Sequence, residues 1–266
     1  MTTGVDEFLN AAGKTIEVFP RLYDDVVQPA AQETGKILAR IPKAINAAFS
    51  SLDIWIANKD YNVEETKLLL SKKLENVEPK KIVPPEPYVA VPAIQAISYS
   101  MNSEELRNMY ANLLANSMNS DTKDSVHPAF IEIIKQLSPF EAKLMKSFSA
   151  KTDWPIIAIS RSNDALNRSG FDCLKHMLPP EFGVNAENYT TFAIAIDNLI
   201  RLNLILVDYS SGFTDKTLYD PILNSNSFIE IKEYISSLDT DNYCFNKNGT
   251  LTLSYLGQSF TNICII

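Results

Sequence analysis

Residues 103–148 read SEELRNMYANLLANSMNSDTKDSVHPAFIEIIKQLSPFEAKLMKSF, and three helix starts can be recognised within them. Ser103 is a typical N-cap residue, and the apolar residues after it recur at the 3.6-residue spacing of a helix. Pro128 suits the first turn of a second helix, because the amide hydrogen that proline lacks has no partner there. Ser138 and Glu141 have the spacing of a capping box. The stretch therefore predicts three successive helices.

The order EELRNMYANLLANSM followed by HPAFIEIIKQLSPFEAKLMKSF resembles the Abi-alpha family of bacterial proteins, which is assigned to abortive infection, a defence against phage. Residues 29–55 and 73–100 are similar to the N-terminal portion of that family in order and spacing. The resemblance covers residues 29–148 and implies a defence role. It supplies no catalytic motif that can be placed residue by residue on this sequence.

The resemblance also indicates where an interaction site is expected. The positions that match the family-like segment are Glu105, Arg107, Tyr110, Asn112, Asn116, His127 and Pro128. Several of them are expected to be structural. Tyr110 should be buried, and Arg107 is spaced to pair with a carboxylate on the same helix.

The composition of the chain limits the classes of protein to which it can belong. The chain has 266 residues, of which 45% are hydrophobic, and a formal net charge of −8. After Ala150 there are 8 basic and 13 acidic side chains, which argues against non-specific nucleic-acid binding by this part. Three cysteines without a CxxC pair fit reduced thiols. With no signal-peptide pattern and no long uncharged apolar window, the sequence predicts a cytoplasmic protein.

The secondary-structure pattern predicts a mainly α protein with two domains. Residues 1–137 read as a helical domain that contains an extended proline-rich connector over residues 78–92. Residues 138–266 are similar to a winged-helix α+β domain. The strands expected there cover 154–160, 203–209 and 249–253, and the helices cover 188–201 and 255–265.

Two histidine-containing patterns suggest catalysis and also have simpler explanations. His127 is a possible general base, but at the entrance of a helix a cap or turn role is favoured. Cys173 and His176 stand three residues apart, within one helical turn, and suggest a thiolate–imidazole pair. A buried cysteine is the favoured alternative, because nothing else of a nucleophile site is recognisable around them.

Metal and cofactor sites have no clear signal. Asp121, Asp124 and Glu132 lack any recognised ligand spacing, so a solvated loop is favoured. Glycine-rich phosphate loops are absent from the sequence. We therefore expect no cofactor, no metal and no enzymatic activity.

Two alternatives to protein contact remain at this point. A winged helix suggests DNA binding, but residues 188–209 carry Arg201 against two aspartates, which makes DNA an unlikely ligand. Lys36, Arg40 and Lys43 share one face of a helix over residues 36–49, which suggests peripheral contact with the inner membrane. Ordinary helix packing is favoured for that pattern.

The sequence thus predicts a phage-defence protein that acts through protein contact without catalysis. Its expected partner is a host or phage protein, or a second copy of the chain. The alternatives are a membrane-surface effector that uses residues 36–49 and a winged-helix DNA-binding regulator.

Overall fold

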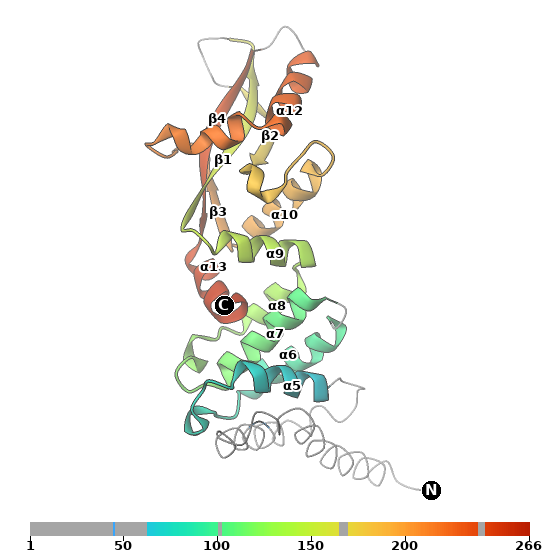
Figure 1. The fold of residues 1–266 in the computed structure, drawn as a ribbon, viewed down its shortest axis with the longest axis vertical. Coiled ribbons are helices and arrows are strands. Elements are labelled where there is room, and N and C mark those ends of the chain that lie inside the picture. Colours follow the sequence, from blue (N-terminus) through green and yellow to red (C-terminus); the bar gives the residue numbers. More distant parts are fainter. Residues whose placement is uncertain (1–44, 46–62, 101–102, 165–169, 239–242) are drawn as a thin grey trace, which may run out of the picture. The chain divides into compact units, whose positions relative to one another are not determined.

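The computed structural model describes residues 45, 63–100, 103–164, 170–238 and 243–266. The chain divides into two compact units, Met1–Gln136 and Leu137–Ile266 (Figure 1). In the described residues, no helix is long and apolar enough to cross a membrane.

The described part of the N-terminal unit is helical. Its helices are α5 (Val63–Lys73), α6 (Pro87–Tyr99), α7 (Glu104–Ser117) and α8 (Ala129–Lys135), with short 3-10 turns η2 (Pro79–Lys81) and η3 (Lys123–Ser125). Helix α7 contacts α5, α6 and α8, and its buried side chains form the centre of this unit. As predicted, Ser103 caps α7, because its hydroxyl accepts a hydrogen bond from the amide of Leu106 at 3.4 Å.

The extended connector predicted over residues 78–92 is wrong from Pro87 onward. Helix α6 starts with Pro87 in its first turn and contains Pro92 in its interior. An interior proline costs a helix about 3 kcal/mol. Burial of a valine or isoleucine side chain contributes roughly 1.5–3 kcal/mol, and Val89, Ile94 and Ile97 are all buried. The burial of this apolar face therefore outweighs the proline.

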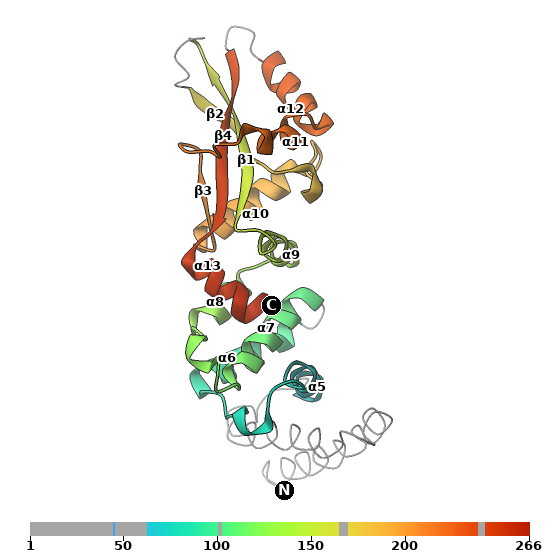
Figure 2. The same ribbon diagram turned by 60° about the vertical axis from the view of Figure 1, so that its left-hand side comes forward.

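The C-terminal unit contains a four-stranded antiparallel sheet with the order β2-β1-β4-β3 (Figure 2). The strands are β1 (Asp153–Ser162), β2 (Phe171–Met177), β3 (Ile205–Asp208) and β4 (Tyr243–Leu253). The helices are α9 (Pro139–Phe148), α10 (Tyr189–Arg201), α11 (Asp220–Leu223), α12 (Asn226–Ser237) and α13 (Tyr255–Phe260), with 3-10 turns η4 (Pro180–Phe182) and η5 (Lys216–Tyr219) and a final π-helical turn, Thr261–Ile265. Strand β1 is central and is buried from Ile156 to Ser162.

The prediction of a mainly α protein with a winged-helix domain is wrong, because the described chain is mixed α/β. A wing is a hairpin of two consecutive strands, whereas α11 and α12 separate β3 from β4 along the chain. Strand β4 has 11 residues and pairs with β1 from Tyr243 to Thr252. Only its last part, residues 249–253, has the β-branched pattern that predicts a strand, so pairing with β1 determines the rest.

Helix α9 begins with the predicted capping box and is joined to α10 through it. The Ser138 hydroxyl accepts a hydrogen bond from the Glu141 amide at 3.2 Å, and the Glu141 carboxylate accepts one from the Ser138 amide at 2.6 Å. The second oxygen of Glu141 accepts a hydrogen bond from Asn198 at 2.9 Å. Phe140 packs edge-on against Phe192, with ring centroids 4.8 Å apart. One local motif therefore also fixes a helix that starts 50 residues later.

Candidate functional site

A β-bulge interrupts the edge strand β2. Two of its residues, Lys175 and His176, oppose the single residue Ala158 of β1, because the register shifts between Ile157 and Ile159. His176 has a φ of 67°, in the left-handed region that residues with a Cβ rarely adopt. The bulge turns the backbone polar groups of these two residues away from the ladder with β1.

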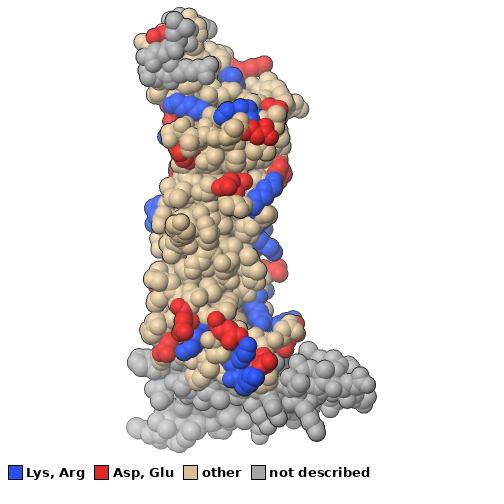
Figure 3. All heavy atoms as spheres, turned by 90° about the vertical axis from the view of Figure 1, so that its left-hand side faces the viewer, with Lys and Arg blue, Asp and Glu red and all other residues tan. Residues whose placement is uncertain are grey.

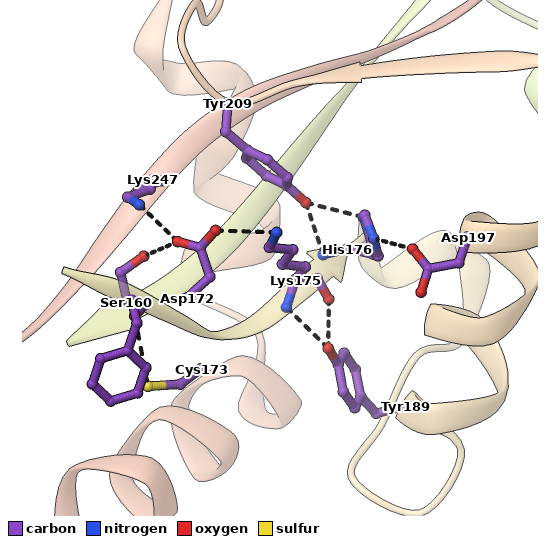
Figure 4. A network of polar contacts seen from close by, with 10 residues as sticks. Ser160, Asp172, Cys173, Lys175, His176, Tyr189, Asp197, Tyr209 and Lys247 are labelled. Carbon is purple, nitrogen blue, oxygen red and sulfur yellow. Dashed lines mark hydrogen bonds and ion pairs between the residues drawn. The ribbon is translucent and has the colours of Figure 1, made fainter. Parts of the chain in front are cut away.

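Two tyrosine hydroxyls bind these backbone groups (Figure 4). Tyr189, the first residue of α10, accepts a hydrogen bond from the Lys175 amide at 3.0 Å and donates one to the Lys175 carbonyl at 2.7 Å. Tyr209, which follows β3, accepts a hydrogen bond from the His176 amide at 2.8 Å. The two hydroxyls supply hydrogen-bond partners for backbone groups that the bulge removes from the ladder with β1, and they thereby stabilise the bulge.

The imidazole of His176 links Tyr209 to Asp197 of α10. The Tyr209 hydroxyl lies 3.1 Å from Nδ1, and an Asp197 carboxylate oxygen lies 3.1 Å from Nε2. A carboxylate only accepts hydrogen bonds, so we assign the proton of the neutral ring to Nε2, which leaves Nδ1 to accept from the tyrosine. Burial lowers the pKa of His176, while Asp197 acts in the opposite direction. Burial also raises the pKa of Tyr209.

Tyr209 reaches His176 because Gly249 leaves room for its ring. A Cβ added at Gly249 would lie 2.6 Å from a ring carbon of Tyr209 and 2.5 Å from the Asp208 carbonyl oxygen. Tyr209 follows β3 at one edge of the sheet, and His176 lies in β2 at the other edge. The tyrosine therefore crosses β4 and β1 and links the two outer strands.

A second polar cluster lies further along β2, around Asp172. Its carboxylate accepts hydrogen bonds from the Ser160 hydroxyl at 2.6 Å and from Lys247 at 2.7 Å, and it lies 3.3 Å from the Lys175 ammonium. Burial alone would raise the pKa of this carboxyl, but the hydrogen bonds from Lys247, Ser160 and Lys175 lower the pKa of Asp172 to about 2. The cluster thus joins β2, β1 and β4 through one ionised carboxylate.

The order carboxylate, imidazole, hydroxyl in Asp197, His176 and Tyr209 is also that of an acid–base relay. Here the hydroxyl already accepts the His176 amide proton, and both ring nitrogens have partners. A general base needs a nitrogen that can reach a substrate proton. The observed contacts engage both ring nitrogens of His176 and connect β2 to α10 and to the residue that follows β3.

The thiolate–imidazole pair considered for Cys173 and His176, which the sequence did not favour, is not formed, because the two residues lie on strand β2 and not on a helical turn. The Cys173 sulfur lies 3.9 Å from the Phe171 carbonyl oxygen. Burial raises the pKa of the Cys173 thiol. The geometry therefore does not join a thiolate to the imidazole.

The structure places the carboxylates considered for a metal in surface ion pairs. Asp121 pairs with Lys81 at 2.7 Å, and Glu132 pairs with Lys135 at 2.7 Å. Asp124 lies 3.8 Å from its neighbour Lys123. The described part of the chain contains no group of three or more His, Cys, Asp or Glu side chains that could hold a metal ion.

The seven interaction residues predicted from the resemblance all lie in the N-terminal unit. Tyr110 and Asn112 are buried, which leaves little of either side chain for a partner. Glu105, Arg107 and Asn116 are half-buried, whereas His127 and Pro128 are exposed. The basic residues Lys36, Arg40 and Lys43 lie outside the described residues.

His127 has the helix-entrance role that the sequence favoured over catalysis. Its Nδ1 accepts a hydrogen bond from the Ala129 amide at 3.1 Å, at the first turn of α8. Its ring lies 6.0 Å from that of Phe130, measured between centroids. His127 therefore helps to start α8.

Sequence reasoning missed most of the bulge site, which consists of His176, Tyr189, Asp197 and Tyr209, and it also missed the neighbouring Asp172 cluster. It considered His176 and Cys173 only as a pair and did not identify Asp172, Tyr189 or Tyr209. Gly249 is the one signal that pointed toward it, because a glycine inside a strand often marks a close approach of another group. The group that approaches can be identified only from the folded structure.

Comparisons with known proteins support the resemblance. A comparison with curated proteins gave no match. Among solved structures, the uncharacterized protein from the hydrocarbon-degrading marine bacterium Alcanivorax borkumensis SK2 is 15% identical, with a TM-score of 0.35, over 50% of this chain and 90% of that chain. A TM-score this low does not establish a shared fold. The family model described as abortive infection alpha matches residues 58–264, most of the sequence, and the chain therefore belongs to the abortive infection alpha family.

Proposed function

We propose that the chain takes part in phage defence by binding a protein partner and does not catalyse a reaction. The family supports the defence role. The observation that supports the non-catalytic mechanism is the hydrogen bonding within the bulge site. Its hydroxyls and imidazole are all engaged in holding β2, so this polar cluster stabilises the fold.

The raised pKa values of two thiols and one phenol support the same mechanism. Burial raises the pKa of Cys173 and of Tyr209, and it raises the pKa of the fully buried Cys264 well above its ordinary value. An activated thiol or phenol nucleophile has a lowered pKa, because the anion is the reactive form. These groups are held as neutral acids at physiological pH.

The charge distribution favours a protein over a nucleic acid as the partner. On the face shown in Figure 3, the basic and acidic side chains of the described residues lie interspersed and form no extended basic field. Binding to a phosphate backbone needs such a field. Large apolar side chains are exposed on the C-terminal unit, among them Ile194, Leu206, Tyr234 and Tyr255. Apolar and aromatic side chains of this kind are typical of protein contacts.

A phage-challenge assay tests the defence role. The chain is expressed alone in a susceptible bacterium, and cell survival is scored against phage yield. We expect phage yield to fall while infected cells die. Protection with full cell survival would contradict the abortive mechanism, and unchanged phage yield would contradict action by this chain alone.

Substitution of the nucleophile candidates tests the mechanism in the same assay. Cys173→Ala should keep full protection, since the thiol has no role in contact-mediated defence. Circular dichroism and the unfolding midpoint serve as controls for the fold. If a variant with an unchanged fold and midpoint loses protection, the mechanism is catalytic and the proposal fails.

A further inference from the structure

The two outer strands of the sheet are linked by one tyrosine–histidine contact that depends on a proton. Strands β2 and β3 lie at opposite edges of the sheet. Tyr209 extends from the end of β3 to the bulge and contacts both the amide and the imidazole of His176. His176 is only 5% exposed, so water has little access to this contact.

In the neutral state each hydrogen-bonding group of this contact has one complementary partner. The His176 amide donates to the Tyr209 oxygen, the tyrosine O–H donates to Nδ1, and Nε2–H donates to Asp197. A proton added to Nδ1 converts that acceptor into a donor. The Tyr209 oxygen then faces two N–H donors, and its own hydrogen loses its acceptor.

Besides Tyr209, the charged and titratable groups around His176 come from α10 and from β2 itself. Asp197 and Tyr189 belong to α10, Lys175 belongs to β2, and the β1 residue opposite is the uncharged Ala158. Asp197 attracts a proton on the ring, but its side chain is 72% exposed, so solvent weakens that attraction. Lys175 opposes protonation, and burial opposes it most strongly.

We propose that this contact is an acid-sensitive latch, in which neutral His176 holds Tyr209 and joins the two outer strands, and protonation releases them. The latch is independent of the proposed function and concerns the C-terminal unit alone. Its closed state is the one observed. Its open state frees the His176 amide at the edge of the sheet.

Amide hydrogen exchange measured by NMR tests the latch. The chain has two histidines, so a His127→Gln background leaves His176 as the one titrating imidazole. After correction for the intrinsic pH dependence of exchange, we expect protection of the His176 amide to fall roughly fivefold between pH 7.5 and 5, the effect of losing one net hydrogen bond. The Ile156 amide, in the centre of β1, should change by less than about twofold. Unchanged protection at His176 would refute the proposal.

Two variants separate the latch from a general acid effect. His176→Asn keeps a residue that tolerates a positive φ and does not titrate, so the pH dependence at the amide of residue 176 should disappear. Tyr209→Phe removes the hydroxyl and should give low protection at both pH values. If His176→Asn does not fold, Tyr209→Phe alone tests the latch. High protection of the His176 amide in this variant at pH 7.5, or a further fall in its protection at pH 5, would exclude the latch.

Discussion

Single residues in the C-terminal unit carry constraints that come from distant parts of the chain. His176 adopts a positive φ that is unfavourable for a residue with a Cβ, and three hydrogen bonds hold it there: its amide and Nε2 donate, and its Nδ1 accepts. Gly249 is required by its neighbour Tyr209 and not by its own backbone conformation, since no positive φ is found there. Both residues are explained by contacts across the sheet.

Gly249→Ala should destabilise the protein by about 1–3 kcal/mol, because the new methyl group overlaps the Tyr209 ring and the Asp208 carbonyl. The measurement is urea unfolding followed by circular dichroism. Thr250→Ala, at the next position of β4, is the matched control and should cost less. In a Tyr209→Ala background the cost of Gly249→Ala should shrink, and strict additivity of the two changes would show that the ring is not the obstacle.

The ionised carboxylate of Asp172 connects three strands of the sheet. The pKa of Asp172 is about 2 when folded, against an ordinary value of 3.8. Because the folded pKa is the lower one, the ionised carboxylate contributes stability above about pH 4, and this contribution is lost as the pH falls from 3.8 toward 2. It joins β2 to β1 through Ser160 and to β4 through Lys247.

Asp172→Asn should therefore reduce the dependence of the unfolding free energy on pH between about pH 4 and pH 2. Urea unfolding at a series of pH values measures this dependence. The exposed Asp220, which does not take part in the cluster, supplies the control variant Asp220→Asn. An equal slope in the wild type and Asp172→Asn would mean that the cluster does not stabilise the ionised form.

The starts of the helices were predicted best, because the residues that cap a helix lie next to it in the sequence. Ser103 and Ser138 cap α7 and α9 as expected, because each cap hydrogen bond spans only three residues. Helix α6 and strand β2 were not predicted, since each depends on partners elsewhere in its unit. The burial of α6 overrides its proline, and β2 lacks the alternating pattern of a strand because the bulge interrupts it.

Ser138→Ala should cost about 0.5–2 kcal/mol, as for other helix caps. Glu141→Gln can keep the capping contact, since glutamine also serves in capping boxes. Thermal unfolding compares the two variants. A Ser138→Ala variant as stable as the wild type would show that packing alone starts α9.

The charge of the whole molecule limits its partners. The net charge is −8, and the residues after Ala150 carry more acidic than basic side chains. Electrostatic attraction to phosphates supplies nearly all of non-specific DNA binding. On the face shown in Figure 3, acidic and basic side chains of the described residues lie interspersed, which supports the proposal that the partner is a protein.

The full chain should not retard duplex DNA in a gel-shift assay at about 150 mM salt, where non-specific affinities depend on phosphate contacts. A basic DNA-binding protein run alongside provides the positive control. Repeating the assay at low salt distinguishes weak electrostatic binding from none. Retardation at the higher salt concentration would point to a specific DNA site and against protein contact.

Hydrogen bonds and apolar spacing within one or two helical turns determine α7, α8 and α9, and the same stretch carries the family resemblance. These features can be predicted from the chain because the interacting residues are close in sequence. Packing decides the sheet and the bulge site. Tyr209 meets His176 across 33 residues, and Lys247 meets Asp172 across 75. Such contacts exist only after the strands pair, so no local pattern encodes them.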